Sequence, residues 1–152
     1  MAGWTNKGKY KVLGWALRAE TPPTNFYVAL VVSTIAPNAD INTLAGLTEI
    51  AAGNGYTTGG YLIARSAVGF DVWTEDDTLD RGLIQCKDVV WTASGGPIPA
   101  SGSGARYAVL TDDNITVASR EVYAYWDLVS DRTVSAGQTL TLQDCEIRVN
   151  ET

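Results

Sequence analysis

The stretch Phe26-Tyr27-Val28-Ala29-Leu30-Val31-Val32-Ser33 decides the fold, because it is apolar at nearly every position over the length of one strand. Aromatic and β-branched residues of this kind are typical of strands. A strand without a polar side needs cover on both of its faces. We therefore predict that Phe26–Ser33 is a central strand of a sheet.

The segment before this strand has helical spacing. Thr5 or Asn6 can cap a helix, and Tyr10, Leu13, Gly14 and Leu17 recur at its period. Gly8 and Gly14 weaken such a helix, and Thr21-Pro22-Pro23-Thr24 ends it, because a residue before proline avoids the α region. We predict one helix within residues 1–20, packed on the sheet or extended as an arm.

The segments after the strand read mostly as short strands with frequent turns. Thr34–Ala45 is a loop by its Pro, Asn and Asp residues, and Leu44–Ala51 is either one helical turn or an extended edge. Ala93–Ala105, rich in Gly, Pro and Ser, looks the most flexible. The predicted strands are Tyr61–Val68, Phe70–Thr74, Leu83–Trp91, Tyr107–Leu110, Val122–Val129, Thr139–Leu142 and the alternating run from Cys145 to Asn150.

The last third predicts which side chains share a face. Val122, Ala124, Trp126 and Leu128 alternate with Tyr123, Tyr125 and Asp127. Leu140 and Leu142 should point inward. Seven or eight short strands and one helix predict a mainly β fold, an antiparallel β-sandwich or barrel-like sheet with one N-terminal helix, forming a single β-rich domain over residues 1–152.

Charge and composition exclude several classes of function. The net charge is −6, and the basic residues are scattered except for Lys7, Lys9 and Lys11, so we expect no nucleic-acid partner. The longest apolar stretch is far shorter than the ~20 residues that span a bilayer, so we expect no membrane partner, and Met1–Thr5 does not resemble a secretory signal. Cys86 and Cys145 are expected to be free, buried thiols, with a disulfide between adjacent strands as the alternative.

Catalytic patterns are lacking in the sequence. The chain has no histidine, and we find neither a nucleophile elbow nor a phosphate-binding glycine motif. Paired carboxylates could serve a glycosidase, but the candidates qualify by residue type alone; they are Glu49, Glu75, Asp76, Asp77 and Asp80. The acidic run also lacks the ligand spacing of a calcium loop, as does Asp112-Asp113-Asn114. We expect no enzyme activity and no cofactor or metal.

Two features suggest recognition. The stretch Gly53-Asn54-Gly55-Tyr56-Thr57-Thr58-Gly59-Gly60 either presents Tyr56 to a partner or uses its glycines only to form tight turns. The strand aromatics either line a sugar-binding face or belong to a core or subunit contact; they are Trp91, Tyr107, Tyr123, Tyr125 and Trp126.

Four segments give the chain a resemblance to small virion proteins of tailed bacteriophages. These segments are Thr24–Val31, Leu47–Ile50, Gly53–Gly60 and Ala105–Leu110, and Ala124–Leu128 is similar to a lesser degree. The resemblance covers about residues 10 to 142. The Gly/Pro/Ser segment around Gly95–Gly104 looks like an insertion relative to this pattern.

The resemblance implies a virion component that is made in the host cytoplasm, with a capsid decoration (cement) role preferred. Its implied partners are the major capsid protein and further copies of itself, with a trimer favoured. In this interpretation the N-terminal part, with Trp4, Lys7, Lys9 and Lys11, reaches a neighbouring subunit. The alternatives are a glycan- or receptor-binding module on a head or tail fibre, and a tail tube or tail-completion subunit with a long hairpin between Phe70 and Trp91.

Overall fold

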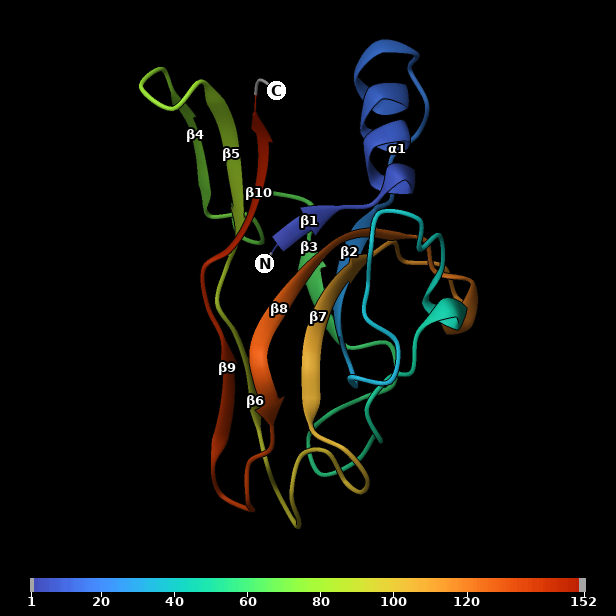
Figure 1. The fold of residues 1–152 in the computed structure, drawn as a ribbon, viewed down its shortest axis with the longest axis vertical. Helices are drawn as coiled ribbons and strands as arrows, with labels where there is room; N and C mark the ends of the chain where they lie inside the picture. The colour runs from blue at the N-terminus through green and yellow to red at the C-terminus, as the bar shows by residue number, and fades with distance from the viewer. Residues whose placement is uncertain (1, 151–152) are drawn as a thin grey trace.

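The computed structural model describes residues 2–150 and shows an open β-sandwich with one helix (Figure 1). Within that range the first layer is an antiparallel five-stranded sheet in the order β1-β8-β7-β2-β3. Its strands are β1 (Ala2–Trp4), β8 (Val122–Arg132), β7 (Ala105–Thr111), β2 (Asn25–Val31) and β3 (Tyr61–Ala64). The predicted mainly β fold with an N-terminal helix is confirmed. Of the two predicted forms, the structure is the sandwich and not a closed barrel.

The second layer consists of two strand groups placed end to end. The three-stranded group has the order β10-β5-β4, and the two-stranded group pairs β6 with β9. The chain runs from β5 to β6 and from β9 to β10 with only two residues between the strands, so two long interrupted strands follow the length of the molecule (Figure 1). These strands are β4 (Val72–Asp76), β5 (Arg81–Cys86), β6 (Val89–Thr92), β9 (Thr139–Leu142) and β10 (Cys145–Asn150).

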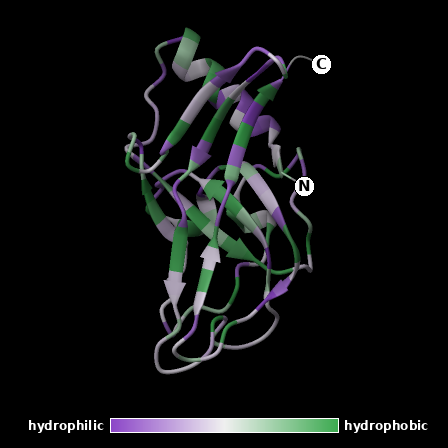
Figure 2. Cartoon of the chain, turned by 90° about the vertical axis from the view of Figure 1, so that its left-hand side faces the viewer, coloured by the Kyte–Doolittle hydropathy of each residue, from purple (hydrophilic) through white to green (hydrophobic). Residues whose placement is uncertain are grey.

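Strand β2 is an interior strand, as predicted, since β3 pairs with one of its edges and β7 with the other. Val28 and Leu30 face the main core between the layers, and Ala29 and Val31 face a smaller core on the outer side of the sheet. The loop after β2 covers that outer core with Leu44, which begins the 3₁₀ turn η1 (Leu44–Gly46), and with Leu47. Hydrophobic residues recur along the strands of both layers in Figure 2.

A β-bulge in β8 interrupts the predicted alternation of its side chains. Leu110 pairs with Ala124, but Thr111 pairs with Val122, so Tyr123 is an extra residue in β8. Ala124, Trp126 and Leu128 share the main core as predicted, whereas Tyr123 joins them there and Val122 turns to the outer core. The period-2 rule fails here because a bulge shifts the strand by one residue.

Three segments depart from prediction in length or order. Tyr61–Val68 is a strand only from Tyr61 to Ala64, and Leu83–Trp91 is divided into β5 and β6 by Lys87 and Asp88. The glycine-rich segment after β6 looks flexible in sequence, but Ile98 is fully buried and exchanges two backbone hydrogen bonds with Val134. An apolar residue in a Gly/Pro/Ser segment can thus anchor it to the core.

Candidate interaction surface

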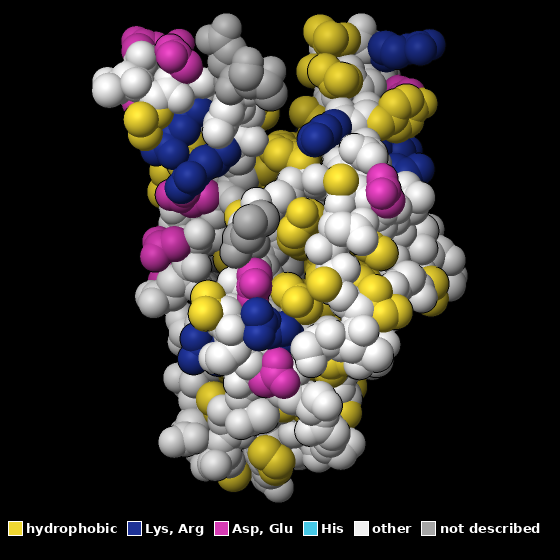
Figure 3. All heavy atoms as spheres, in the orientation of Figure 1, with side chains coloured by type: hydrophobic (Ala, Val, Ile, Leu, Met, Phe, Trp, Pro, Cys, Tyr) yellow, Lys and Arg dark blue, Asp and Glu magenta, His cyan; other side chains and the backbone are white. Residues whose placement is uncertain are grey.

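One end of the molecule carries two projections with a groove between them (Figure 3). One projection is the helix α1 (Asn6–Leu17), and the other is formed by β4, β5 and the end of β10. We call them the helix prong and the hairpin prong. The groove has a volume of about 440 Å³ and is mostly apolar; it is lined by Trp4, Lys9, Val12, Leu13, Arg148, Val149 and Asn150.

The helix prong is docked on the bulge of β8. The Thr5 side chain accepts a hydrogen bond from the Gly8 amide at 2.9 Å, which caps the helix, and donates to the Val122 carbonyl at 2.5 Å. A β-carbon on Gly8 would lie 2.2 Å from the Tyr123 carbonyl oxygen, so only glycine allows this approach. Trp15 completes the contact, with edge-to-face packing on Phe26 and Tyr123.

This docking leaves much of the apolar surface of the helix without cover. The predicted stripe of Tyr10, Leu13 and Leu17 faces solvent, and Leu17 is 78% exposed. The helix and its cap are therefore confirmed, but the stripe does not pack on the sheet. A helix normally buries its apolar stripe, so this flank is suited to a partner outside the chain.

The hairpin prong adds apolar residues of its own. Trp73 on β4 is 88% exposed and Val149 on β10 is 65% exposed. The register aligns Trp73 with Ile84 and Ile84 with Ile147, which puts these three side chains and Val149 on one face of the prong. Ile147 belongs to the main core, so the same apolar face continues from the core into the prong and becomes exposed.

The edge of β10 that borders the groove is partly closed by two indoles. Trp4 donates to the Arg148 carbonyl at 2.7 Å, and Trp126 donates to the Glu146 carbonyl at 2.9 Å. Both carbonyls therefore point away from β5. Indole donors on an edge strand reduce its capacity to pair with a further strand, so the groove is better suited to side-chain contacts.

The N-terminal candidates for partner binding are divided by the structure. Residues 2–4 form β1, which pairs with β8, and the Trp4 indole is hydrogen-bonded to β10. This part is therefore held within the chain, and the predicted arm to a neighbouring subunit does not extend from it. Lys7 and Lys11 lie 3.5 and 3.4 Å from the carboxylate oxygens of Glu121. Lys9 is exposed and lines the groove, which makes it the basic candidate best placed for a partner.

Tyr56 is buried, with an exposed fraction of 2%, so the prediction that its loop presents the ring for recognition is wrong. Its hydroxyl donates to Glu49 at 2.6 Å and accepts from the Leu30 amide at 2.9 Å. Burial raises the pKa of Tyr56 well above its ordinary value, with the Glu49 charge as a second cause. The glycines of this loop allow its turns, and the tyrosine ties the loop to β2.

Glu49 is held in the same network. It accepts from the Gly59 amide at 2.6 Å as well as from Tyr56. Burial raises the pKa of Glu49, against the lowering effects of these two hydrogen bonds and of the Arg120 charge. Arg120 is also buried; it donates to the Gly59 carbonyl at 2.9 Å and lies 3.8 Å from the centre of the Tyr27 ring. These contacts fix a loop.

The other chemical candidates lie apart from Glu49. Asp76, Asp77 and Asp80 lie at the tip of the hairpin prong, and Glu75 precedes them on β4. No group of three or more acidic or cysteine side chains arranged to hold a metal ion occurs in residues 2–150. Asp112 accepts from the Asn114 and Glu121 amides, and burial raises its pKa, which is the pattern of a structural turn.

The two cysteines are opposite each other on β5 and β10, and both are free and buried as expected. Burial raises the pKa of Cys86 to about 12, and burial also raises the pKa of Cys145. Thiols with raised pKa values are poor nucleophiles at neutral pH. This pair therefore contributes to packing between the strands.

Most of the strand aromatics belong to the core of the chain itself. Trp91, Tyr123 and Trp126 are buried in the main core, and Tyr107 and Tyr125 pack on the outer one. Their positions agree with the interpretation of these aromatics as core residues. Trp73 on β4 is far more exposed than these residues, and the aromatic pattern did not single it out.

Comparison with known proteins leaves the fold and the surface as the basis for function. No protein-family model matches the chain, and no curated protein or solved structure gives a significant match. Within the described residues, no helix has the length and apolar character needed to cross a membrane.

Proposed function

We propose that this protein is a structural subunit of a bacteriophage virion that binds the capsid surface as a decoration (cement) protein. The observation that supports the proposal is the uncovered apolar surface of the two prongs, with Leu13 and Leu17 on one side and Trp73 and Val149 on the other. The resemblance in Thr24–Val31 and Gly53–Gly60 supplies the viral context.

The binding free energy that this surface can supply is consistent with assembly on a shell. Burial of one large apolar side chain is worth about 1.5–3 kcal/mol before the costs of association. Several such side chains on one end give a modest affinity per copy, and an oligomer that binds several identical sites on a shell at once gains avidity. The prongs are built on paired strands and a capped helix, so they can present this surface with little rearrangement.

The test is sedimentation of the purified protein with undecorated heads. We expect wild type to co-sediment at saturable occupancy and the double variant Leu13→Gln, Leu17→Gln to bind at least tenfold more weakly, because each buried leucine contributes more than the 1.4 kcal/mol of a tenfold change. The matched control is Ile115→Gln, since Ile115 is 96% exposed but lies outside the prongs.

Two results would contradict the proposal: a wild-type protein that stays in the supernatant, or a double variant that binds heads as Ile115→Gln does. Deletion of residues 1–9 is a poor test, because it removes β1 and the helix cap.

A tail tube or tail-completion subunit is the second candidate, and the β4–β5 hairpin is the observation that favours it. Co-sedimentation with tails and not with heads would support this candidate in place of the first. The glycan-binding alternative has less support, since the aromatics that suggested it are packed in the cores.

A further inference from the structure

The two prongs carry opposite charge. From Asn6 to Arg18 the chain has Lys7, Lys9, Lys11 and Arg18 and no acidic residue. The segment from Asp71 to Asp80, which forms β4 and the turn after it, has five acidic residues and no basic one, and β5 then begins with Arg81. Figure 3 shows acidic side chains at the tip of the hairpin prong with basic side chains below them, and basic side chains on the helix prong. In a chain with a net charge of −6, this concentration of positive charge beside an apolar groove favours an acidic occupant.

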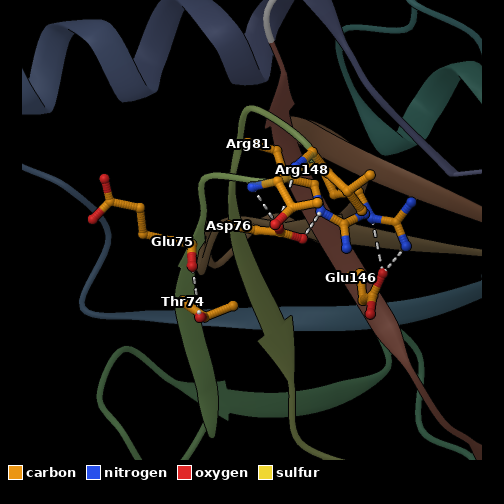
Figure 4. A network of polar contacts seen from close by, with 8 residues as sticks. Thr74, Glu75, Asp76, Arg81, Glu146 and Arg148 are labelled. Atoms are coloured by element: carbon orange, nitrogen blue, oxygen red, sulfur yellow. Dashed lines mark hydrogen bonds and ion pairs between the residues drawn. The ribbon is translucent and has the colours of Figure 1, made fainter.

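Some of these charges are already paired, and the rest are available. Asp76 pairs with Arg81, whose Nε lies 3.1 Å away, and Arg148 pairs with Glu146. Figure 4 shows both pairs and shows Glu75 pointing away from them. Within residues 2–150, no ion pair involves Glu75, Asp77 or Asp80 on the hairpin, or Lys9 or Arg18 on the helix.

The hairpin also carries exposed apolar side chains, which a mostly apolar groove can bury. Trp73 and, at the tip, Leu79 are both exposed beside the acidic side chains. A mostly apolar groove with Lys9 on its wall is complementary to a segment that combines an indole with carboxylates. The hairpin of the same molecule does not fill this groove, because β5 pairs with β10 and no residue of β4 or β5 lines the groove.

We infer that the groove between α1 and β10 receives the acidic β4–β5 hairpin of a second copy of this chain. The contact joins unlike surfaces, so two copies can exchange hairpins reciprocally, or several copies can close a ring. The leucines of the helix prong then cover Trp73, and Lys9 and Arg18 face Glu75 and Asp77. The proposed capsid contact uses the same side chains, so on any one copy the two contacts exclude each other, and self-association is the state expected in solution before heads are added.

Charge reversal with mass measurement tests the inference. The helix variant is Lys9→Glu, Arg18→Glu, and the hairpin variant is Glu75→Lys, Asp77→Lys. All four side chains are exposed and unpaired within the described chain, so both variants should fold, as circular dichroism and thermal midpoints will check. Asp80 is left unchanged because its φ of 47° is a backbone conformation that aspartate tolerates better than lysine.

We expect wild type to elute as an oligomer in size-exclusion chromatography with light scattering, and each variant alone to elute as a monomer. An equimolar mixture of the two variants should recover an oligomer with an even number of copies, because each reversed hairpin then meets a reversed helix and each native hairpin meets a native helix. A chain with all four substitutions should also recover the wild-type oligomeric mass, and its net charge equals the −6 of wild type. Recovery would exclude net charge as the cause.

A wild type that is monomeric up to millimolar concentration would overturn the inference. An oligomer that the hairpin variant leaves intact would overturn it too, since the helix flank would then pair with something other than the hairpin. The outcome is separable from that of the cement proposal: monomers that bind heads contradict only the hairpin contact, and oligomers that ignore heads contradict only the viral role.

Discussion

At the scale of single residues, Gly60 shows how backbone contacts specify the sequence of a loop. Its φ is +83°, and a β-carbon there would lie 1.9 Å from the Val28 carbonyl oxygen of β2. Gly137 has almost the same φ, +84°, with no atom within 4 Å of the β-carbon position. We expect Gly137→Ala to cost about 1–2 kcal/mol for the left-handed backbone, and Gly60→Ala to cost about 1–3 kcal/mol more for the clash. Urea unfolding of both variants measures the difference, and equal losses would show that the loop moves away from β2.

Glu49 gives a pH dependence whose sign follows from its burial. Its pKa is raised from 4.5 in the folded chain, so the folded state binds the proton more tightly than the unfolded state. The free energy of unfolding should therefore be greatest below pH 4.5 for this group and should fall as the pH rises through its folded pKa. Glu49→Gln keeps an oxygen that can accept from Tyr56 and Gly59 but cannot ionise. We expect the stability of wild type relative to Glu49→Gln to decrease from pH 4.5 toward neutrality. A constant difference across that range would contradict the raised pKa.

At the scale of elements, the strands were largely predictable and the orientation of the helix was not. A run such as Phe26–Ser33 has a single interpretation, because a strand that is apolar on both faces can only be central. The helix has apolar residues on more than one side, and its period alone cannot say which side docks. The side that docks is determined by Gly8, which allows close approach to the Tyr123 carbonyl, and by the bulge at Tyr123. In the sequence a glycine only lowers helix propensity, and no local pattern predicts the bulge.

The same arrangement predicts that the two sides of the helix respond differently to mutation. Leu13→Gln and Leu17→Gln should each change the free energy of unfolding of the isolated protein by less than about 0.5 kcal/mol, because both side chains are exposed and glutamine keeps the helix propensity. Trp15→Ala should cost roughly 3 kcal/mol, since the ring packs on Phe26 and Tyr123. Thermal and urea unfolding provide the comparison. A large loss at Leu17 would mean that the helix stripe is covered within the chain.

At the scale of the whole molecule, the candidate surface is formed by segments that lie far apart in the sequence. The helix prong comes from residues 6–17, and the hairpin prong from residues near 72–86 and 145–150. Lys9 and the hairpin could each be predicted from the sequence, but their position at one end could not, because it depends on β5 and β10 continuing past the sandwich. Tyr56 was also a candidate for partner binding, because a glycine-rich stretch around an aromatic residue has the same sequence pattern whether the ring is exposed or buried.

This architecture predicts a gradient of local stability that assembly should change. Strands β2 and β7 lie within the five-stranded sheet and are buried on both faces, whereas the tip of the hairpin has exposed side chains and pairs on one side only. In the isolated protein at low concentration, amide hydrogen exchange should therefore be slowest in β2 and fastest around residues 76–81. At concentrations where the protein self-associates, protection should rise together in residues 73–82 and 9–17, because the same contact covers both prongs. Protection of the helix without the hairpin would indicate that another surface fills the groove.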